Sequence, residues 1–418
     1  MGPGDQGYRS ESGLMSNAIV DPPVDFLLNS RVDRSRPYGS AELAVLGGKA
    51  YAEAKRIITS WPGYAPTPLL SLSGIAAGAG VGALYYKDEG PRFSLGSFKA
   101  LGGAYAVTRL AHEWKLRDGR DTSQLTVTCA TDGNHGRAVA WGARQVGCKC
   151  VVFVHELVSA GRVAAMERYG AEVRRVPGNY DDAVHHAATA AKHNGWTVVS
   201  DTSYAGYTEI PRQVMQGYSL LMDEALQQLP AADVPTHVFV QGGVGGLAAA
   251  LAAYLWEIYG ADRPCVIVVE PDKADCLLRS CRAGGLQIVS GKLDTIMAGL
   301  ACGEPSLIAW EMLHKAADAF MSIRDKDAVA CMRLLAAPPA GDPCVVAGES
   351  GVAGLAGLLA VAGDQAIRAA LGMDAASRVL VIGTEADTDP ELYAELIGPS
   401  LAARVAREKS GDLVAAAK

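Results

Sequence analysis

The stretch GSFKALGG, residues 96–103, places a lysine in unusual company. Lys99 follows Ser97 and an aromatic residue, and it precedes the paired glycines Gly102 and Gly103. A solvent-exposed lysine needs no such surroundings. A lysine that attacks a carbonyl does, because the amine must first lose its proton, and a site that lowers its pKa makes this possible at neutral pH. Lys99 is therefore the candidate nucleophile.

A glycine-rich loop stands between a predicted strand and a predicted helix in QGGVGGLAAA, residues 241–250. Its backbone N–H groups are free to converge on an anion, and the helix N-terminus adds the positive end of its dipole. No Lys-Ser/Thr pair follows, and the spacing is not that of a dinucleotide-binding loop. The sequence therefore predicts a site for a cofactor with one phosphate, made by Gly242, Gly243, Val244, Gly245 and Gly246.

Two further loops carry polar side chains just past predicted strands. Asp132, Asn134 and His135 cluster in TDGNHG, residues 131–136, and Asp201 follows a later strand. A helix N-cap accounts for one polar residue in the first loop but does not require three. Asp201 read alone is more often a turn residue. Because ligands bind beyond the carboxyl ends of parallel strands, we expect both aspartates in the same crevice.

The elements that position these loops alternate between short β-branched runs and amphipathic stretches. This alternation predicts an α/β fold, with parallel strands joined by crossover helices on both faces of a sheet. We predict strands in 125–131, 149–156, 171–178, 196–202, 236–241, 263–271 and 377–385. We predict helices in 135–147, 160–170, 180–195, 208–228 and 246–260.

The four central strand–helix units predict a smaller inserted α/β domain over residues 110–235. The larger domain, which we expect to bind the cofactor, then combines residues 1–109 with residues 236–418. Within it, residues 1–17 read as a flexible leader. We expect the ligand crevice to lie beyond the strand ends, where the polar, glycine-rich loops gather.

The composition is that of an ordinary globular chain. It has 418 residues, of which 49% are hydrophobic and 20% charged, and a formal net charge of −7 without a basic run, so nucleic acid is a poor partner. The most apolar segments are too short and too interrupted to span a bilayer. Nine irregularly spaced cysteines suggest no zinc site and favour reduced thiols in the cytoplasm, although Cys276 and Cys281 are near enough in sequence to pair.

Together these features resemble the fold-type II family of pyridoxal-phosphate enzymes. The resemblance rests on Ser-Phe-Lys at 97–99, the DGNHG loop and the glycine loop, and it extends over the stretches 86–107, 131–143, 200–218, 295–306 and 383–390. It implies two three-layer domains built on parallel sheets, with pyridoxal 5′-phosphate in the cleft between them. It also implies a homodimer.

The resemblance assigns roles to individual residues. The lysine that matches Lys99 forms a Schiff base with the cofactor aldehyde. Asn134 should meet the cofactor's ring hydroxyl, and residues 242–246 should hold its phosphate. The ring nitrogen should face a neutral hydroxyl, for which Thr384 and Thr388 are equal candidates.

The members that this chain resembles most remove ammonia from 2,3-diaminopropionate by α,β-elimination, which yields pyruvate and two ammonia molecules. In these members two aspartates act as bases on opposite faces of the substrate. The resemblance implies that Asp132 acts on the D isomer and Asp201 on the L isomer. Ser97 and His135 are expected on the substrate side of the site.

Three alternatives stay open at this point. A threonine or serine dehydratase would share Lys99, Asn134 and the glycine loop but would not call for a pair of carboxylates. A β-replacement enzyme would pass its intermediate to a second nucleophile, and would then depend on an added acceptor. A non-catalytic ligand-binding homologue would be expected to have lost either the lysine or the glycine loop, and this chain retains both.

Overall fold

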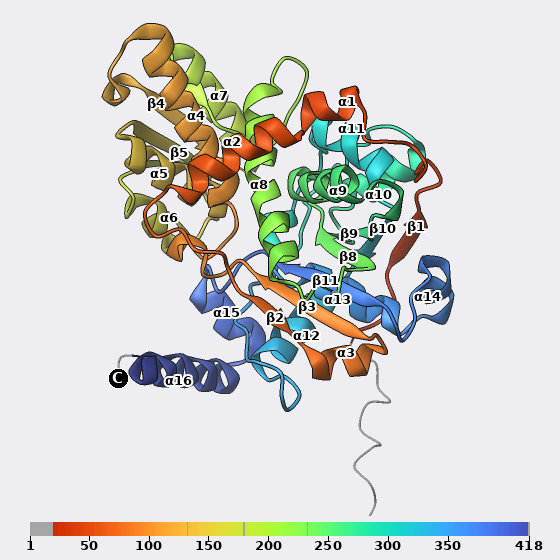
Figure 1. Cartoon of the computed structure of the whole chain (residues 1–418). Helices are drawn as coiled ribbons and strands as arrows, with labels where there is room; N and C mark the ends of the chain where they lie inside the picture. Colours follow the sequence, from red (N-terminus) through yellow and green to blue (C-terminus); the bar gives the residue numbers. More distant parts are fainter. Residues whose placement is uncertain (1–19, 132, 179, 232, 417–418) are drawn as a thin grey trace, which may run out of the picture.

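A computed structural model describes residues 20–131, 133–178, 180–231 and 233–416 (Figure 1). The predicted leader, residues 1–17, and the candidate base Asp132 lie outside the described residues. The described strands form two separate β-sheets, and the segment that forms the smaller sheet is inserted between the strands of the larger one.

The larger sheet has seven strands in the order β1-β10-β9-β8-β11-β3-β2. Their bounds are β1 Asp25–Leu28, β2 Leu69–Ser71, β3 Ala83–Asp88, β8 His237–Gln241, β9 Cys265–Pro271, β10 Ala319–Ile323 and β11 Arg378–Gly383. The five inner strands are parallel, and the edge strands β1 and β2 are antiparallel to their neighbours. The sheet is therefore mixed at its edges and parallel where it meets the site.

Apolar side chains cover both faces of this sheet. On β8, Val238 and Val240 belong to a core shared with α9 (Gly246–Tyr259), whereas Phe239 belongs to a second core shared with α13 (Ala353–Ala362). Successive side chains on a strand point to opposite faces, so this division shows a layer of helices on each side. An inner strand of this kind reads as a continuous apolar run, which is why VFV was recognisable in the sequence.

The smaller sheet has four parallel strands in the order β6-β5-β4-β7. Their bounds are β4 Thr126–Ala130, β5 Lys149–His155, β6 Glu172–Val176 and β7 Thr197–Val198. Val151 and Phe153 face α7 (Tyr180–Asn194), and Val152 and Val154 face the core that contains α5 (Asn134–Val146).

The remaining helices complete the layers or close the ends of the chain. Their bounds are α1 Ser40–Val45, α2 Gly48–Thr59, α3 Ser73–Ala79, α4 Ala100–Asp118, α6 Ala160–Glu167, α8 Glu209–Gln228, α10 Cys276–Ala283, α11 Leu307–Ala316, α12 Asp325–Ala336, α14 Gln365–Leu371, α15 Pro390–Ile397 and α16 Pro399–Ala416. Short 3₁₀ turns lie at η1 Arg92–Ser94, η2 Thr122–Gln124, η3 Gly260–Asp262 and η4 Ala298–Leu300.

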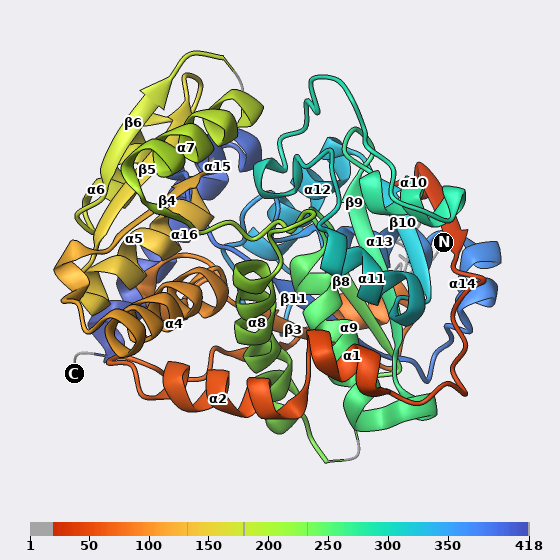
Figure 2. The same cartoon turned by 90° about the horizontal axis from the view of Figure 1, so that it is seen from above.

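Two helices join the sheets. α4 packs against α5 of the smaller sheet and against α8, and α8 in turn packs against α9 of the larger sheet. Both views show α8 between the two groups of strands (Figures 1 and 2). One apolar core therefore runs from the smaller sheet through α4 and α8 to the larger sheet. The predicted domain boundaries at 110 and 235 stay predictions, and residue 110 falls inside α4.

The α/β architecture and every strand and helix predicted above are present, with bounds that differ by a few residues. β1, β2, β3 and β10 were not predicted, and two of these are the short antiparallel edges. No single described helix is long and apolar enough to cross a bilayer. α13 and α14 pass such a test only as a pair bent by 109°, and α13 is largely buried.

Candidate active site

The predicted site residues follow the carboxyl ends of neighbouring strands. In the larger sheet β8 leads into the glycine loop, and its neighbour β11 leads into Thr384. In the smaller sheet the adjacent strands β4 and β7 lead to Asn134 and Asp201. Lys99 lies between these two groups, at the start of α4. This is the crevice that parallel α/β sheets offer to ligands.

Backbone contacts fix the loop that carries Lys99. Phe98 N donates to Thr384 O at 3.1 Å, and Ser97 forms an isolated antiparallel bridge with Glu385. Ser97 is buried, with 2% of its surface exposed. The lysine loop is thereby attached to the end of β11, the inner strand next to β8, which leads into the glycine loop.

Lys99 forms an ion pair with Asp201, which lies 102 residues away in sequence. The Nζ and Oδ2 atoms are 2.6 Å apart, and the side chains are 19% and 15% exposed. Burial lowers the pKa of Lys99, but the Asp201 carboxylate outweighs it and the net shift is upward. Burial raises the pKa of Asp201, but the Lys99 ammonium holds it well below its usual range.

The lowered lysine pKa expected from the sequence is thus wrong for the free amine. A carboxylate in direct contact stabilises the ammonium form more than partial burial destabilises it. At neutral pH the pair consists of an ammonium and a carboxylate, so Asp201 already holds the form that accepts a proton.

His135 lies on the other side of Asp201. Its Nε2 is 2.8 Å from Val199 O, and its Nδ1 is 3.8 Å from Asp201 Oδ2. Burial lowers its pKa, so the ring is neutral at pH 7. Because a carbonyl oxygen only accepts, Nε2 carries the hydrogen and Nδ1 is a bare acceptor, which has no hydrogen-bond partner among the described residues. Nδ1 and Oδ2 are therefore two acceptors that face each other and could share one donor.

Asn134 opens α5 and contacts the larger sheet. Its Nδ2 donates to Glu385 Oε2, while Ser350 N donates to Glu385 Oε1 at 3.0 Å. The Asn134 Oδ1 atom is buried and has no partner within the described part of the chain. An orphaned acceptor of this kind is expected where a ligand completes the hydrogen bonding.

The glycine loop forms a close-fitting cradle. A Cβ on Gly242 would lie 2.7 Å from Val268 Cγ1, and Gly245 has φ +95° at the start of α9. Ser306 N donates to Val244 O at 2.8 Å, which holds the loop from outside. In the part of the chain that the structure describes, the N–H groups of Gly243, Val244 and Gly245 have no partner. Gly246 lies close to Asp201, with a built Cβ 3.8 Å from its backbone oxygen.

The two candidate threonines differ in position. Thr384 is buried directly after β11, and Gln241 Nε2 lies 3.4 Å from its Oγ1. Thr388 is only partly buried, and its backbone oxygen lies 3.4 Å from a guanidinium nitrogen of Arg137. Thr384 therefore lies at the strand edge that carries the glycine loop, and Thr388 lies beside the Lys99 loop near Gly96.

Two buried carboxylates near the site, Glu349 and Glu385, had no role in the sequence analysis. Glu349 and Glu385 are each 5% exposed, and Arg162 lies 3.1 Å from Glu349 Oε1. Burial and the charge of Glu385 raise the pKa of Glu349 to about 7. The only sequence signal was the position of each glutamate within a short glycine-flanked or strand-terminal loop.

The cysteines of the chain are all free thiols, so Cys276 and Cys281 are not paired. No group of three or more metal-ligating side chains occurs in the described ranges.

Comparisons with known proteins show which family model and which relatives match this chain. The family model "Pyridoxal-phosphate dependent enzyme" matches residues 60–385. Diaminopropionate ammonia-lyase of Escherichia coli (strain K12) is 43% identical over 349 residues, which cover 80% of this chain and 88% of the relative. The enzyme of the same name from Salmonella typhimurium is 38% identical over 387 residues and covers 87% and 96%.

Solved structures agree. The crystal structure of the Escherichia coli diaminopropionate ammonia lyase in complex with D-serine superimposes with a TM-score of 0.83 at 37% identity, and covers 92% of this chain and 99% of that one. Threonine deaminase isoform 2 from Solanum lycopersicum has a TM-score of 0.72 at 20% identity, which supports the fold alone.

Proposed function

The chain belongs to the pyridoxal-phosphate-dependent enzymes, and from that premise we propose that its site removes ammonia from 2,3-diaminopropionate by α,β-elimination. The products are pyruvate and two ammonia molecules, and the enzyme is a carbon–nitrogen lyase. The observation that carries the proposal is the Lys99–Asp201 contact of 2.6 Å beside the glycine loop, in a chain 43% identical to a diaminopropionate ammonia-lyase.

The residues present fit pyridoxal 5′-phosphate. The free N–H groups of Gly243, Val244 and Gly245 would hold its phosphate, and the orphaned Asn134 Oδ1 would accept a hydrogen bond from its ring hydroxyl. When bound to Lys99, this cofactor supplies a carbonyl-derived carbon that takes up the substrate amine and withdraws electrons from its Cα.

Among the candidate threonines we assign Thr384 to the cofactor's ring nitrogen. Gln241 Nε2 is a donor, so Thr384 Oγ1 accepts from it and keeps its own hydrogen for an acceptor elsewhere. An unprotonated ring nitrogen is such an acceptor. A neutral partner such as Thr384 would leave the bound ring a weaker electron sink, which would favour elimination over transamination.

Asp201 and Lys99 exchange a proton at defined atoms. The ionised Oδ2 of Asp201 accepts the proton from the substrate Cα. Once Lys99 has given up its own proton, the contact at 2.6 Å lets its Nζ take up the proton from Asp201. Because the Lys99 charge is what lowers the pKa of Asp201, removing that charge makes Asp201 a stronger base.

His135 lies where it can hold the leaving β-nitrogen. An amine does not leave as an amide anion, so the β-nitrogen must be an ammonium before its bond to Cβ breaks, and it then departs as ammonia with the electron pair of that bond. The Nδ1 atom of His135, which has no hydrogen-bond partner among the described residues, accepts a hydrogen bond from that ammonium. Ser97, buried at the start of the same loop, is the proposed contact for the other end of the substrate.

We extend the proposal to both enantiomers. The α-hydrogens of the two enantiomers lie on opposite faces of the substrate's Cα, so each enantiomer needs a base on its own face. We assign Asp201 to the L isomer and Asp132 to the D isomer. A relative with 37% identity is known in complex with D-serine, which supports access of a D-amino acid.

The test follows pyruvate release from D- and L-2,3-diaminopropionate by the purified, cofactor-loaded protein. D-Serine and L-threonine serve as comparison substrates. Pyruvate from both diaminopropionate isomers is the expected result. Turnover of the hydroxy amino acids alone would reassign the protein as a dehydratase, and pyruvate that depends on an added acceptor would favour β-replacement.

The variants Asp201→Asn and Asp132→Asn test the division of labour. Asp201→Asn should lose about 10²–10⁴-fold of the L activity and little of the D activity, with the opposite result for Asp132→Asn. Equal loss of both activities in either variant would contradict the assignment.

We propose further that the enzyme is a cytoplasmic homodimer. The free thiols fit a reducing compartment, and the homodimer follows from the family resemblance. Sedimentation equilibrium should give about twice the chain mass of 43.6 kDa, and a monomer at micromolar concentration would contradict the homodimer.

A further inference from the structure

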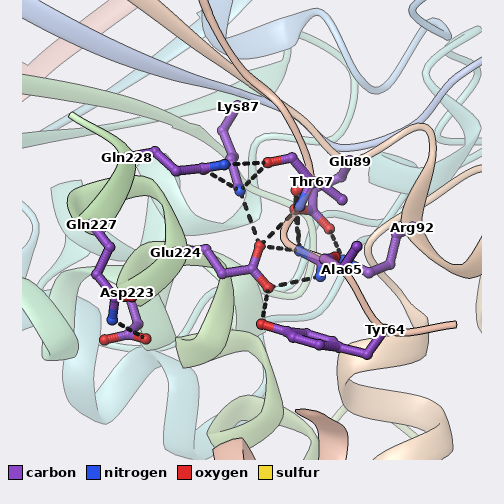
Figure 3. A network of polar contacts seen from close by, with 10 residues as sticks. All are labelled: Tyr64, Ala65, Thr67, Lys87, Glu89, Arg92, Asp223, Glu224, Gln227 and Gln228. Atoms are coloured by element: carbon purple, nitrogen blue, oxygen red, sulfur yellow. Dashed lines mark hydrogen bonds and ion pairs between the residues drawn. The ribbon is translucent and has the colours of Figure 1, made fainter. Parts of the chain in front are cut away.

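A buried network of charges includes residues that come shortly before the lysine loop in the sequence. Two cations and two carboxylates, with side chains no more than 3% exposed, are joined by Thr67 and Gln228 (Figure 3). The four charged residues are Lys87, Glu89, Arg92 and Glu224. They come from β3, from the residue directly after β3, from η1 and from α8, so they tie the segment before Lys99 to the helix that joins the sheets.

Arg92 and Glu224 form the centre of this network. Arg92 reaches both oxygens of Glu224, at 2.8 and 2.7 Å, and both oxygens of Glu89, at 2.7 and 2.8 Å. Lys87 Nζ makes three hydrogen bonds, to Thr67 O, Glu224 Oε2 and Gln228 Oε1, at 2.7, 3.0 and 2.8 Å. Bidentate pairs of this kind fix geometry as well as charge.

The chain directly after Arg92 has an unfavourable backbone. Phe93 and Ser94 have φ values of +50° and +57°, and they are two of the three non-glycine residues with positive φ among those described. Gly96 follows with φ +78°. Left-handed backbone at side-chain-bearing residues costs energy and persists only where the surroundings impose it. Such strain five residues before Lys99 therefore has to be held by neighbouring contacts.

Contacts on both sides hold the strained turn. The Phe93 ring stacks on Trp141 of α5 with centroids 4.9 Å apart, and Arg137 donates to Leu95 O at 2.8 Å. On the opposite side, Arg92 is anchored to Glu224 of α8. The turn is thus clamped between the smaller sheet and α8.

The helix α8 also packs closely against the start of α4, next to Lys99. A Cβ on Gly217 would lie 1.8 Å from Leu101 O, and one on Gly102 would lie 2.5 Å from Tyr218 Cε1, so α4 and α8 touch through their backbones here. Glu224 lies seven residues beyond Gly217, which is two helical turns or about 10.5 Å along the same face. One helix, α8, therefore contacts both the charge network and the start of α4 beside Lys99.

We propose that the Arg92–Glu224 network positions Lys99: it fixes the strained turn Phe93–Gly96 against α8 and so sets the Nζ atom beside Asp201. Arg92 and Glu224 are positioning residues that do not touch the reacting atoms. The proposal rests on Lys99 being the reactive amine, and not on which amino acid is the substrate.

The experiment compares three variants of the cofactor-loaded protein. Glu224→Gln removes one charge of the network, and the double variant Arg92→Gln/Glu224→Gln removes one charge of each sign. Asp223→Asn is the matched control, because Asp223 is the adjacent residue of α8 and pairs with Lys55 at 2.8 Å and with Tyr254 at 2.7 Å, outside the network.

Four quantities are measured: thermal unfolding, amide hydrogen exchange over residues 93–101, the visible absorption band of the lysine-linked cofactor, and kcat with KM. In Glu224→Gln we expect exchange in 93–101 to rise about tenfold or more and the absorption band to change its pH dependence. We expect kcat to fall about tenfold while KM changes less than about threefold. Asp223→Asn should leave all of these within about twofold of the starting protein.

The double variant separates positioning from simple stability. It leaves one cation, Lys87, and one carboxylate, Glu89, so the buried charges balance again and it should regain much of the thermal stability that Glu224→Gln loses, while exchange in 93–101, the absorption band and kcat stay altered. It also carries the test if Glu224→Gln fails to fold. The proposal is overturned if stability and kcat recover together, if Glu224→Gln leaves exchange unchanged, or if Asp223→Asn reproduces its effects. Exchange is measured without substrate, so a wrong substrate assignment does not affect this outcome.

Discussion

Lys87 and Lys99 are twelve residues apart and have opposite surroundings. Lys87 is fully buried, and each of its three hydrogens has an acceptor in a network whose charges balance. Lys99 is partly exposed and pairs with the Asp201 carboxylate, and acceptors on Asn134 and His135 have no partner among the residues that the structure describes. Burial of charge is common to both sites, whereas incomplete hydrogen bonding is specific to the site around Lys99. A satisfied network is expected to serve the fold, and unsatisfied buried atoms mark where a ligand belongs.

We call the incompletely hydrogen-bonded surroundings of Lys99 the open site, and the saturated network of Lys87, Glu89, Arg92 and Glu224 the closed network. The largest expected effect comes from removing Lys99. Lys99→Ala should lower kcat/KM for diaminopropionate by about 10³-fold or more. The variant loses the amine that binds the cofactor and that exchanges a proton with Asp201 over 2.6 Å. Its unfolding temperature should change by only a few degrees, since the site is partly solvated. Steady-state kinetics and calorimetry measure the two quantities. A loss of stability without a loss of activity would contradict the view that Lys99 serves activity and Lys87 serves stability.

The next effect concerns the lysine of the closed network. Lys87→Met should lower the free energy of unfolding by about 3–5 kcal/mol, because it leaves a buried carboxylate with one cation fewer and Thr67 O and Gln228 with one donor fewer. Urea denaturation followed by circular dichroism gives this number. Lys55→Met is the control, since its ammonium pairs with Asp223 and its side chain is 40% exposed. Equal effects in both variants would mean that complete hydrogen bonding of the network adds nothing to the free energy of unfolding.

A smaller effect depends on pH at Glu349, which borders the open site. Its folded pKa of about 7 lies above the ordinary value of 4.5. A raised pKa contributes stability that is complete below about pH 4.5 and is lost as the pH rises through about 7. Glu349→Gln should therefore gain about 1–3 kcal/mol relative to the starting protein between pH 4.5 and pH 8.

Urea denaturation at these two pH values checks the expectation for Glu349. Glu395→Gln, at an exposed position of α15, serves as the control. A parallel stability profile for Glu349→Gln and the starting protein would show that Glu349 titrates normally in the fold.

The sequence predicted the open site better than the closed network. The glycine loop, residues 242–246, and Asn134 were recognisable because strand–loop–helix patterns place them at strand ends, and the α/β pattern follows from apolar periodicity. The Lys99–Asp201 contact needed the fold, because 102 residues separate the two side chains. The direction of the Lys99 pKa shift was wrong for the same reason.

The network around Arg92 left almost no trace in the sequence. Glu224 lies in SLLMDEALQQ and reads as one polar residue of an amphipathic helix, although it is 4% exposed. Phe93 and Ser94 adopt left-handed backbone without the glycine that usually signals it. Pairings over such sequence separations depend on tertiary packing, which local periodicity does not encode.

One measurement tests the central claim, that incomplete hydrogen bonding marks Lys99 as the reactive lysine. The protein is loaded with pyridoxal 5′-phosphate, reduced with borohydride to fix the cofactor to its lysine, digested and mapped by mass spectrometry. We predict one pyridoxyl group per chain, on Lys99. A label on Lys87 or on any other lysine, or none at all, would contradict the account.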